Sequence, residues 1–366
     1  MRHLSEVQLD LEALRGNCRA LKALAGEAKV FAVVKANAYG HGLAEIVQAL
    51  DGHADGFQVD DIEELREVRR WSSARILVLG YVQARDLAEA AALGGDLALY
   101  DLERARGFAQ HGVVAHLKVD NLLGRQGVLP ERLDEFAEQV LQAGVDVRSA
   151  YGHFANIEDT TDLTHAQAQL EVFEEAFALL RHRWPNLQRH VSATSGLMTV
   201  ERENAFVRTG IGLYGLYPSQ ALERSHSDLN LQPVMRWVSH LAQVKRIPRG
   251  HPVGYGLTYF ASREMTIGIV PQGYADGYDR GLTNSGCVLV RGRRCPVVGR
   301  VAMNMFAVDL SQVPEASSED EVVLLGAQGE ERITAEEIAA RLGTIHYEVV
   351  SRVSPLLPRV ALPPRP

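Results

Sequence analysis

Short apolar runs alternate with amphipathic helical patterns from residue 29 to about residue 225, and this alternation limits the fold more than any other feature. The clearest helix, 163–180, has apolar residues at spacings of three and four. Repeated strand–helix units of this kind predict an α/β fold, a parallel (β/α)8 barrel of the TIM type rather than an open sheet. The candidate strands are 30–35, 56–59, 75–79, 97–100, 113–120 and 147–154, with two weaker ones near residue 190 and at 206–208.

The pattern changes after the polar stretch 223–228. One helix stands out in this part, 334–342, with a capping box formed by Thr334 and Glu337 and a stop at Gly343. We expect a barrel domain over residues 1–230 and a mostly β C-terminal domain over residues 231–366. The first strand can belong either to the barrel or to the sheet of the C-terminal domain. The candidate strands of the second domain are 237–244, 265–270, 287–290, 297–298, 306–310 and 321–325.

Composition narrows the class of protein. The net charge of −8 over 366 residues argues against a nucleic-acid partner. No run approaches the length of a membrane span, and the N-terminal residues contain no apolar signal core. The three cysteines, an odd number, have no metal-binding spacing and suit a reduced compartment. We therefore expect a cytoplasmic enzyme without a metal ion and without a nucleic-acid or membrane partner.

Lys35 ends the apolar run 30–34, and strong helix breakers follow it before a helical pattern begins at Leu43. An α/β barrel places its chemistry at the carboxyl ends of its strands. Desolvation and nearby cations can lower the pKa of a lysine there until its amine attacks carbonyl groups. In isolation, such a lysine would more often reach from the strand end into solvent.

The residues around this lysine carry a specific resemblance. The segment 32–42, AVVKANAYGHG, resembles the cofactor-lysine motif of alanine racemases, which are fold-type III enzymes dependent on pyridoxal 5′-phosphate (PLP). The resemblance covers most of the sequence, from Val7 to Arg359. It implies that Lys35 forms the covalent link to PLP and that Tyr39 contacts the PLP phosphate.

Two later segments imply further cofactor contacts. The segment 207–215, VRTGIGLYG, matches V-R-x-G-I-x-x-Y-G of the family, in which the arginine, here Arg208, donates to the pyridine nitrogen of PLP. Arginine does not give up its proton, so that nitrogen should stay unprotonated, which favours reprotonation over side reactions. Gly210 and Ile211 would offer backbone N–H groups to the phosphate. Ser195 lies where the family has a phosphate-binding serine, although the family's N-S-A is Thr-Ser-Gly here.

The resemblance also implies a second catalytic base. The segment 253–259, VGYGLTY, resembles the one that carries the family's catalytic tyrosine, here Tyr255. Racemisation needs acid–base groups on both faces of a planar intermediate, and Lys35 and Tyr255 would supply them. In the family this tyrosine comes from the second subunit, which implies a homodimer with shared sites. His153 matches a barrel histidine that binds the tyrosine, and Arg208 would continue that relay.

Substrate contacts follow from the same resemblance. Tyr274 would line the substrate entrance, Met303 would bind the substrate carboxylate through its backbone N–H, and Arg125 would supply a positive partner. Lys118 shares a strand face with His116 and Asp120. In many family members this lysine is carbamylated; the alternative is an unmodified lysine paired with Asp120.

The sequence departs from the family pattern at several positions. Asn304 replaces an acid after the carboxylate-binding methionine, and the loop 120–124 lacks the usual T-G-M-G. Pro355 aligns with a tyrosine that walls the pocket, so a roomier site is expected. His190 lies one residue from the position of a family histidine that packs beside the cofactor.

Together these features predict a PLP enzyme that interconverts L-alanine and D-alanine by a two-base mechanism, with serine as a further substrate. The expected purpose is D-alanine for peptidoglycan. A PLP decarboxylase of basic amino acids is the nearest rival, but such enzymes carry a glutamate at the pyridine nitrogen and a cysteine base, where this sequence has Arg208 and Tyr255. A PLP-carrier protein consisting of the barrel alone is disfavoured by the second domain.

Overall fold

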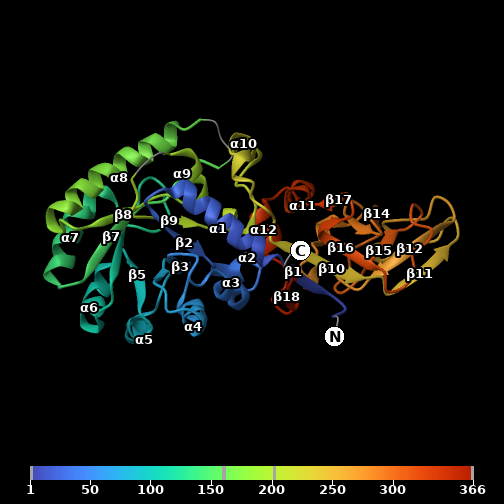
Figure 1. Ribbon diagram of the computed structural model, residues 1–366, viewed down its shortest axis with the longest axis horizontal. Helices are drawn as coiled ribbons and strands as arrows, with labels where there is room; N and C mark the ends of the chain where they lie inside the picture. Colours follow the sequence, from blue (N-terminus) through green and yellow to red (C-terminus); the bar gives the residue numbers. More distant parts are fainter. Residues whose placement is uncertain (1–2, 159–161, 201–202, 364–366) are drawn as a thin grey trace. The chain divides into compact units, whose positions relative to one another are not determined.

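The computed structural model describes residues 3–158, 162–200 and 203–363 (Figure 1). By its internal contacts the chain divides into two compact units. The barrel unit comprises Glu12–Ala36 and Ile46–Gln232. The β unit comprises the segment up to Leu11, Asn37–Glu45 and the chain from Pro233 onward.

The barrel unit contains an eight-stranded parallel sheet in the order β8-β7-β6-β5-β4-β3-β2-β9. Between β8 and β9, Ala205 N donates to Arg189 O and Arg208 N donates to Ser192 O, each at 3.0 Å, so the barrel is nearly closed. This confirms the predicted fold class. The strands are β2 (Lys29–Val33), β3 (Gly56–Val59), β4 (Ile76–Val78), β5 (Gly95–Leu99), β6 (Ala115–Lys118), β7 (Val147–Tyr151), β8 (Gln188–His190) and β9 (Phe206–Thr209).

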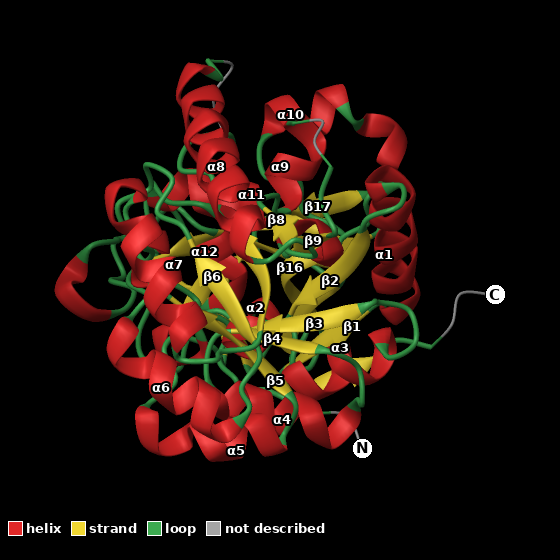
Figure 2. Cartoon of the chain, turned by 90° about the vertical axis from the view of Figure 1, so that its left-hand side faces the viewer, coloured by secondary structure: helices red, strands yellow, loops and turns green. Residues whose placement is uncertain are grey.

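Helices cover the outside of these strands (Figure 2). Their ends are fixed by local side chains: Asp61 accepts from Glu64 N at the start of α4, and Asp101 accepts from Glu103 N at the start of α6. Within the part of the chain that the structure describes, no helix is long and apolar enough to cross a membrane. Apart from the short helix α2 (Lys35–Tyr39), which is described with the site, the α-helices between residues 11 and 232 are α1 (Leu11–Ala25), α3 (Leu43–Leu50), α4 (Ile62–Trp71), α5 (Leu87–Ala92), α6 (Leu102–His111), α7 (Leu133–Gln142), α8 (Thr164–Arg183), α9 (Thr194–Thr199) and α10 (Gln220–Ser225).

The β unit is built on a second sheet. Strand β1 (Glu6–Leu9) belongs to this sheet, antiparallel to β10 (Met235–His240) and parallel to β18 (Arg359–Ala361). Helices α11 (Ala335–Leu342) and α12 (His346–Ser351) complete the unit. The remaining strands are β11 (Gln243–Ile247), β12 (Met265–Val270), β13 (Cys287–Val290), β14 (Arg293–Val298), β15 (Phe306–Asp309), β16 (Glu321–Gln328) and β17 (Glu331–Ile333).

One local prediction for this unit was wrong, and three short elements were not predicted. The run 237–244 is not one strand, because the chain turns after His240 and β11 begins at Gln243. Strands β17 and β18 and helix α12 were missed. Each is only three to six residues long, too short for its periodicity to be recognised.

Candidate active site

Lys35 lies just beyond the carboxyl end of β2, as its position in the sequence predicts. Its Nζ is 3.6 Å from Asp60 Oδ1 at the end of the neighbouring strand β3, and the two side chains are 40% and 55% exposed. The Glu64 carboxylate ties the two strand ends together, because it accepts from Ala36 N at 2.6 Å and from Asp60 N at 2.8 Å. Sequence reasoning missed both acids, although a glutamate in the first turn of a βα helix was the available signal.

The residues after Lys35 form a left-handed turn. Ala36, Asn37, Ala38 and Tyr39, within α2 (Lys35–Tyr39), all have φ of 53° to 54°. This region costs an L-residue roughly 1–2 kcal/mol, so consecutive residues adopt it only where the surroundings impose it. Asn37 supplies part of that constraint: its Oδ1 accepts from Leu43 N at 2.9 Å and its carbonyl accepts from Gly42 N at 3.0 Å.

The other end of the turn is held inside the β unit. Gly40 has φ of +81°, and a Cβ at this position would lie 2.0 Å from Val350 O, so only glycine fits. Arg359 Nη2 donates to Gly40 O at 2.6 Å. The Tyr39 ring packs near Tyr347, with ring centroids 6.3 Å apart. The position of Tyr39 therefore depends on this strained turn and its clamps.

Arg208 is 3% exposed inside the barrel. Its Nη1 contacts His190 Nδ1 and also donates to His190 O at 3.1 Å, while Nη2 donates to Gly152 O and Val191 O, each at 3.1 Å. Burial lowers the pKa of Arg208 to about 10. His190, which sequence analysis placed only near the cofactor, is thus a direct partner of this arginine.

Three predicted residues gather near Arg208. Lys118 is 2% exposed, and its Nζ has no hydrogen-bond partner among the described residues. Burial, followed by the charges of Arg208 and Arg125, lowers the pKa of Lys118 to about 7. The same factors, burial and then Arg208 and Lys118, hold the pKa of His153 well below its usual range. The alternative pairing of Lys118 with Asp120 is not formed, because Asp120 Oδ1 instead accepts from Leu123 N and Gly124 N, each at 3.0 Å.

Three of the predicted phosphate-binding residues, Ser195, Gly210 and Ile211, follow the ends of β8 and β9. Ser195 lies in α9, and its Oγ donates to Glu158 Oε1 at 3.2 Å. Gly210, which precedes Ile211, donates its backbone N–H to Thr194 Oγ1 at 3.1 Å. The Gly210 N–H is therefore already engaged by a side chain of this protein. Neighbouring Ser195 and Ile211 follow the same two strand ends.

The β unit gathers a second set of predicted residues around a shallow pocket of about 470 Å³. Its lining includes Tyr255, Tyr274, Met303 and Asn304. Tyr274 N donates to Ala302 O at 3.1 Å, so the two loops are bonded to each other. Tyr255, Tyr274 and Met303 are 75%, 43% and 55% exposed, an unusual amount for apolar side chains lining one pocket.

Tyr255 stands on a turn that requires glycine on both sides. Gly254 and Gly256 have φ of +73° and +71°. A Cβ at Gly256 would lie 2.6 Å from Arg300 Nε. The sequence G-Y-G therefore fixes the backbone so that the phenol extends outward from the surface of the β unit.

Comparison with known proteins agrees with this geometry. Residues 9–218 match the family described as alanine racemase, N-terminal domain, and residues 234–361 match its C-terminal domain. The chain is 37% identical over 363 residues to an alanine racemase of Syntrophobacter fumaroxidans, covering 94% of each protein. It is 37% identical over 365 residues to one of Streptococcus gordonii, covering 97% of each.

Solved structures give the same result. The alanine racemase from D-cycloserine producing Streptomyces lavendulae superposes with a TM-score of 0.93 at 32% identity, covering 100% of this chain and 98% of that one. The Bacillus anthracis enzyme with bound L-Ala-P has a TM-score of 0.91 at 30% identity, covering 99% and 96%. The barrel with Lys35 at a strand end, the β unit and these full-length similarities show that the chain belongs to the alanine racemase family of isomerases.

Proposed function

We propose that this protein interconverts L-alanine and D-alanine with PLP attached to Lys35. The observation that carries the proposal is that the barrel holds both a strand-end amine, Lys35, and Arg208, a buried donor held by three backbone carbonyls and His190. A guanidinium cannot accept a proton, so it suits a cofactor ring nitrogen that stays unprotonated. A glutamate there would favour the opposite state.

The other barrel residues fit PLP by their chemistry. Arg125 adds positive charge near Lys118 and Arg208, which suits a substrate carboxylate. Ile211 would hold the phosphate together with Tyr39, and Ser195 and Gly210 would do so only if their bonds to Glu158 and Thr194 open. When bound, PLP withdraws electrons from the substrate Cα and makes its proton acidic.

Lys35 and Tyr255 would then hold and move the proton on opposite faces of Cα. One base cannot reach both sides of a buried planar carbon. The pKa of His153 lies well below its usual range, because of burial and the nearby cations, so its imidazole is neutral and able to accept a hydrogen bond from the Tyr255 phenol. His153 would thereby hold Tyr255 in place.

We propose that Tyr255 acts in the site of a second subunit. Tyr255 and Met303, together with Leu257 at 61% and Met305 at 54% exposure, present apolar side chains around one pocket or its bounding turn. Exposed apolar patches of this kind mark protein interfaces, and a C2 dimer would place each patch against the partner. Met303 N–H and Arg125 would bind the substrate carboxylate, and Tyr274 would line the entrance.

Two finer parts of the proposal concern substrate and role. Pro355 stands where a tyrosine ring would wall the pocket, so serine should be accepted beside alanine. The product would supply D-alanine for peptidoglycan. The similar alanine racemases of Syntrophobacter fumaroxidans and Streptococcus gordonii support the reaction, whereas serine turnover and the cell-wall role rest on the sequence alone.

The shared site can be tested by mixing inactive variants. Lys35→Ala and Tyr255→Phe should each abolish most turnover in both directions. Subunit exchange between them should restore activity, because one of the two sites in a hybrid dimer holds both wild-type groups. Borohydride should fix a pyridoxyl group on the peptide containing Lys35. Labelling of another lysine, or exchange without recovery, would contradict the assignment.

A further inference from the structure

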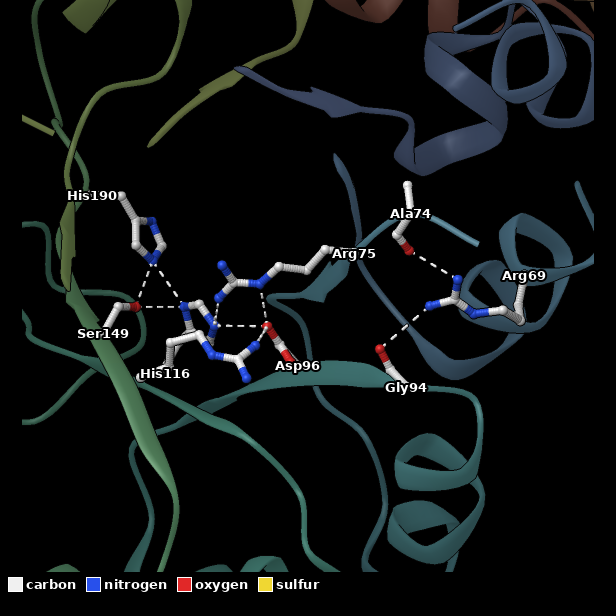
Figure 3. A network of polar contacts seen from close by, with 9 residues as sticks. Arg69, Ala74, Arg75, Gly94, Asp96, His116, Ser149 and His190 are labelled. Atoms are coloured by element: carbon white, nitrogen blue, oxygen red, sulfur yellow. Dashed lines mark hydrogen bonds and ion pairs between the residues drawn. The ribbon is translucent and has the colours of Figure 1, made fainter. Parts of the chain in front are cut away.

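The interior of the barrel contains a cluster of polar side chains, whereas such barrels are usually packed with branched apolar residues. Four polar side chains on neighbouring strands form this cluster, each at most 5% exposed: Asp96 on β5, His116 on β6, Ser149 on β7 and His190 on β8 (Figure 3). Burying polar groups is unfavourable unless every one has a partner. Such a cluster therefore indicates a task that apolar packing would not perform.

The direction of the hydrogen bonds is set at Arg208. An arginine has only donors, so His190 Nδ1 accepts from it. Burial, followed by the charge of Arg208, holds the pKa of His190 well below its usual range, so the ring is neutral. The single ring proton must then lie on Nε2, which is 3.0 Å from Ser149 Oγ and 3.1 Å from His116 Nδ1.

The same direction continues to Asp96. Ser149 Oγ lies 2.5 Å from His116 Nδ1 and can donate to it after accepting from His190. Burial lowers the pKa of His116 to about 4, so this ring is also neutral and carries its proton on Nε2. That nitrogen is 3.4 Å from Asp96 Oδ2. Every donor finds an acceptor in the Arg208–Asp96 series, which consists of Arg208, His190, Ser149, His116 and Asp96.

Arg75 offers the competing arrangement. Its Nη2 lies 3.1 Å from His116 Nε2, and an arginine can only donate there. While that contact acts as a hydrogen bond to the ring, the proton of His116 lies on Nδ1 and the series is reversed. Asp96 opposes the reversal because its Oδ2, 3.4 Å from His116 Nε2, can only accept and therefore favours a proton on that nitrogen. Burial alone would raise the pKa of Asp96, but the bond to His116 and the charge of Arg75 outweigh it and keep the carboxylate ionised.

Packing fixes the ring orientation of His190, so that only the position of its proton can change. Its ring is stacked between Tyr151, at 4.9 Å and 3° between planes, and Phe206, at 4.0 Å between centroids. The ring cannot easily rotate. The lone pair on Nδ1 is therefore available to Arg208 only while Nε2 carries the proton. No carboxylate pairs with Arg208 within the described residues, so this lone pair and the backbone carbonyls alone hold the guanidinium.

We infer that Asp96 is a positioning residue for Arg208, acting through His116, Ser149 and His190 to keep the Nδ1 lone pair of His190 on the guanidinium. The inference rests on the proposed role of Arg208 at the cofactor ring nitrogen. Asp96, near the amino end of β5, would thereby help to set the electronic state of the cofactor. Arg148, which also bonds Asp96 Oδ2 at 2.7 Å, is a charge partner outside the series.

The proton positions can be measured without any substitution. The full-length, cofactor-free protein, labelled with 15N in its histidines, should show neutral imidazoles for His116 and His190 with the proton on Nε2 in both. The resonances are assigned from single His→Gln variants. A proton on Nδ1 of His190, or a charged ring at neutral pH, would overturn the inference.

The effect on the site is tested in the PLP-loaded enzyme. In Asp96→Asn the amide can donate to His116 Nε2 and reverse the series, as in other Asp→Asn changes that leave a histidine in the wrong tautomer. We expect kcat to fall about 10- to 100-fold, as for other residues that orient a functional side chain through an intermediary. KM for alanine should stay within about threefold, because no substrate contact is lost. The absorption band of the bound cofactor should shift.

Arg148→Met is the matched control, since it removes a charge partner of Asp96 but no member of the series. It should keep the wild-type absorption band and kcat. An Asp96→Asn enzyme with the wild-type band and kcat, or an Arg148→Met enzyme with the same losses, would show that Asp96 serves only the ion pairs. Failure of Lys35 to bind PLP would overturn the proposed function instead, and the imidazole measurement on the cofactor-free protein would still decide the series.

Discussion

The amino group of Lys118 lies 4.9 Å from the centre of the Tyr151 ring, in the barrel interior beside Arg208. An ammonium ion is attracted to an aromatic face, but this contact does not replace the hydrogen bonds that water would give. The pKa of about 7 means that a large fraction of Lys118 is the neutral amine at physiological pH. A neutral amine is the form that adds to CO2.

We therefore expect Lys118 to form a carbamate. Its Nζ attacks the carbon of CO2, the nitrogen releases a proton, and the new carboxylate becomes an anion between Arg208 and Arg125. The charges of Arg208 and Arg125, which lower the pKa of Lys118 after burial, also favour the carbamate anion, because both cations would then gain a partner. Incubation with 13C-labelled bicarbonate should give one carbamate resonance in the 13C spectrum.

Lys118→Gln should lose that resonance, whereas substitution of the exposed Lys245 should leave it unchanged. If the carbamate orients Arg125, the Gln variant should also show a raised KM for alanine that high bicarbonate does not lower. A wild-type spectrum without the resonance at neutral pH would show that the amine stays unmodified.

A second prediction concerns the clamp on the left-handed turn. Besides Gly40 O, Arg359 donates to the carbonyls of Ser354, Leu357 and Val353, at 2.6, 2.6 and 3.2 Å. Hydrogen bonds from a charged donor contribute roughly 1.5–3 kcal/mol each. Arg359→Met should therefore lower the free energy of unfolding by about 2–4 kcal/mol. Because Tyr39 follows the turn, PLP affinity should fall as well.

Urea unfolding of the cofactor-free protein and a PLP titration measure the two effects. Arg263→Met is the control, because its side chain is 64% exposed and lies 4.0 Å from Asp309. It should change stability by less than about 0.5 kcal/mol. Unfolding at the wild-type urea concentration in Arg359→Met would mean that the turn is held without the clamp.

The barrel could be predicted from sequence because short apolar runs alternate regularly with helical patterns, the clearest of which became the 20-residue helix α8. Lys35 and Arg208 were placed by local motifs, and the structure puts both in the barrel. The left-handed turn could not be foreseen, since K-A-N-A-Y has the composition of an ordinary helix, and only the glycines at 40 and 42 hint at unusual backbone.

The Arg208–Asp96 series was missed for a different reason. Its members lie on five different strands, and each alone resembles an isolated polar residue in an apolar run. They meet only through strand register, for example His116 opposite Ser149 in the pairing of β6 and β7. A single sequence does not encode that register in any local pattern.

Buried neutral histidines should make the fold sensitive to acid. Burial lowers the pKa of His41 and of His116 from 6.5 to about 4, while His153 and His190 lie well below 6.5. The unfolded chain takes up these protons near pH 6.5 and the folded chain does not. The contribution of these histidines to the free energy of unfolding is therefore complete above about pH 6.5 and is lost as the pH falls towards 4. His41 and His116 would each contribute roughly 3 kcal/mol to that loss.

Urea unfolding of the cofactor-free protein between pH 7.5 and 4.5 measures the effect. The midpoint should fall steadily below about pH 6.5, and the exposed-residue control His251→Gln should follow the same curve. A midpoint independent of pH across this window would show that these rings exchange protons with water in the folded state.

The last prediction concerns selectivity and Pro355. Ser354 N donates to Asp276 O at 3.0 Å, and a Cβ on Gly277 would lie 2.4 Å from Arg352 O, so the segment before Pro355 is fixed against the turn that follows Tyr274. A tyrosine at 355 would extend from this fixed backbone and add a ring to the wall. Sites that rely on packing separate neighbours differing by a methylene-sized group by about 1–3 kcal/mol. The wild-type enzyme should therefore racemise serine measurably, and Pro355→Tyr should lower kcat/KM for serine relative to alanine by about 10-fold or more. Pro355→Ala, which adds no ring, should keep the wild-type ratio; equal ratios in all three enzymes, or serine turnover at background, would mean that another side chain walls the pocket.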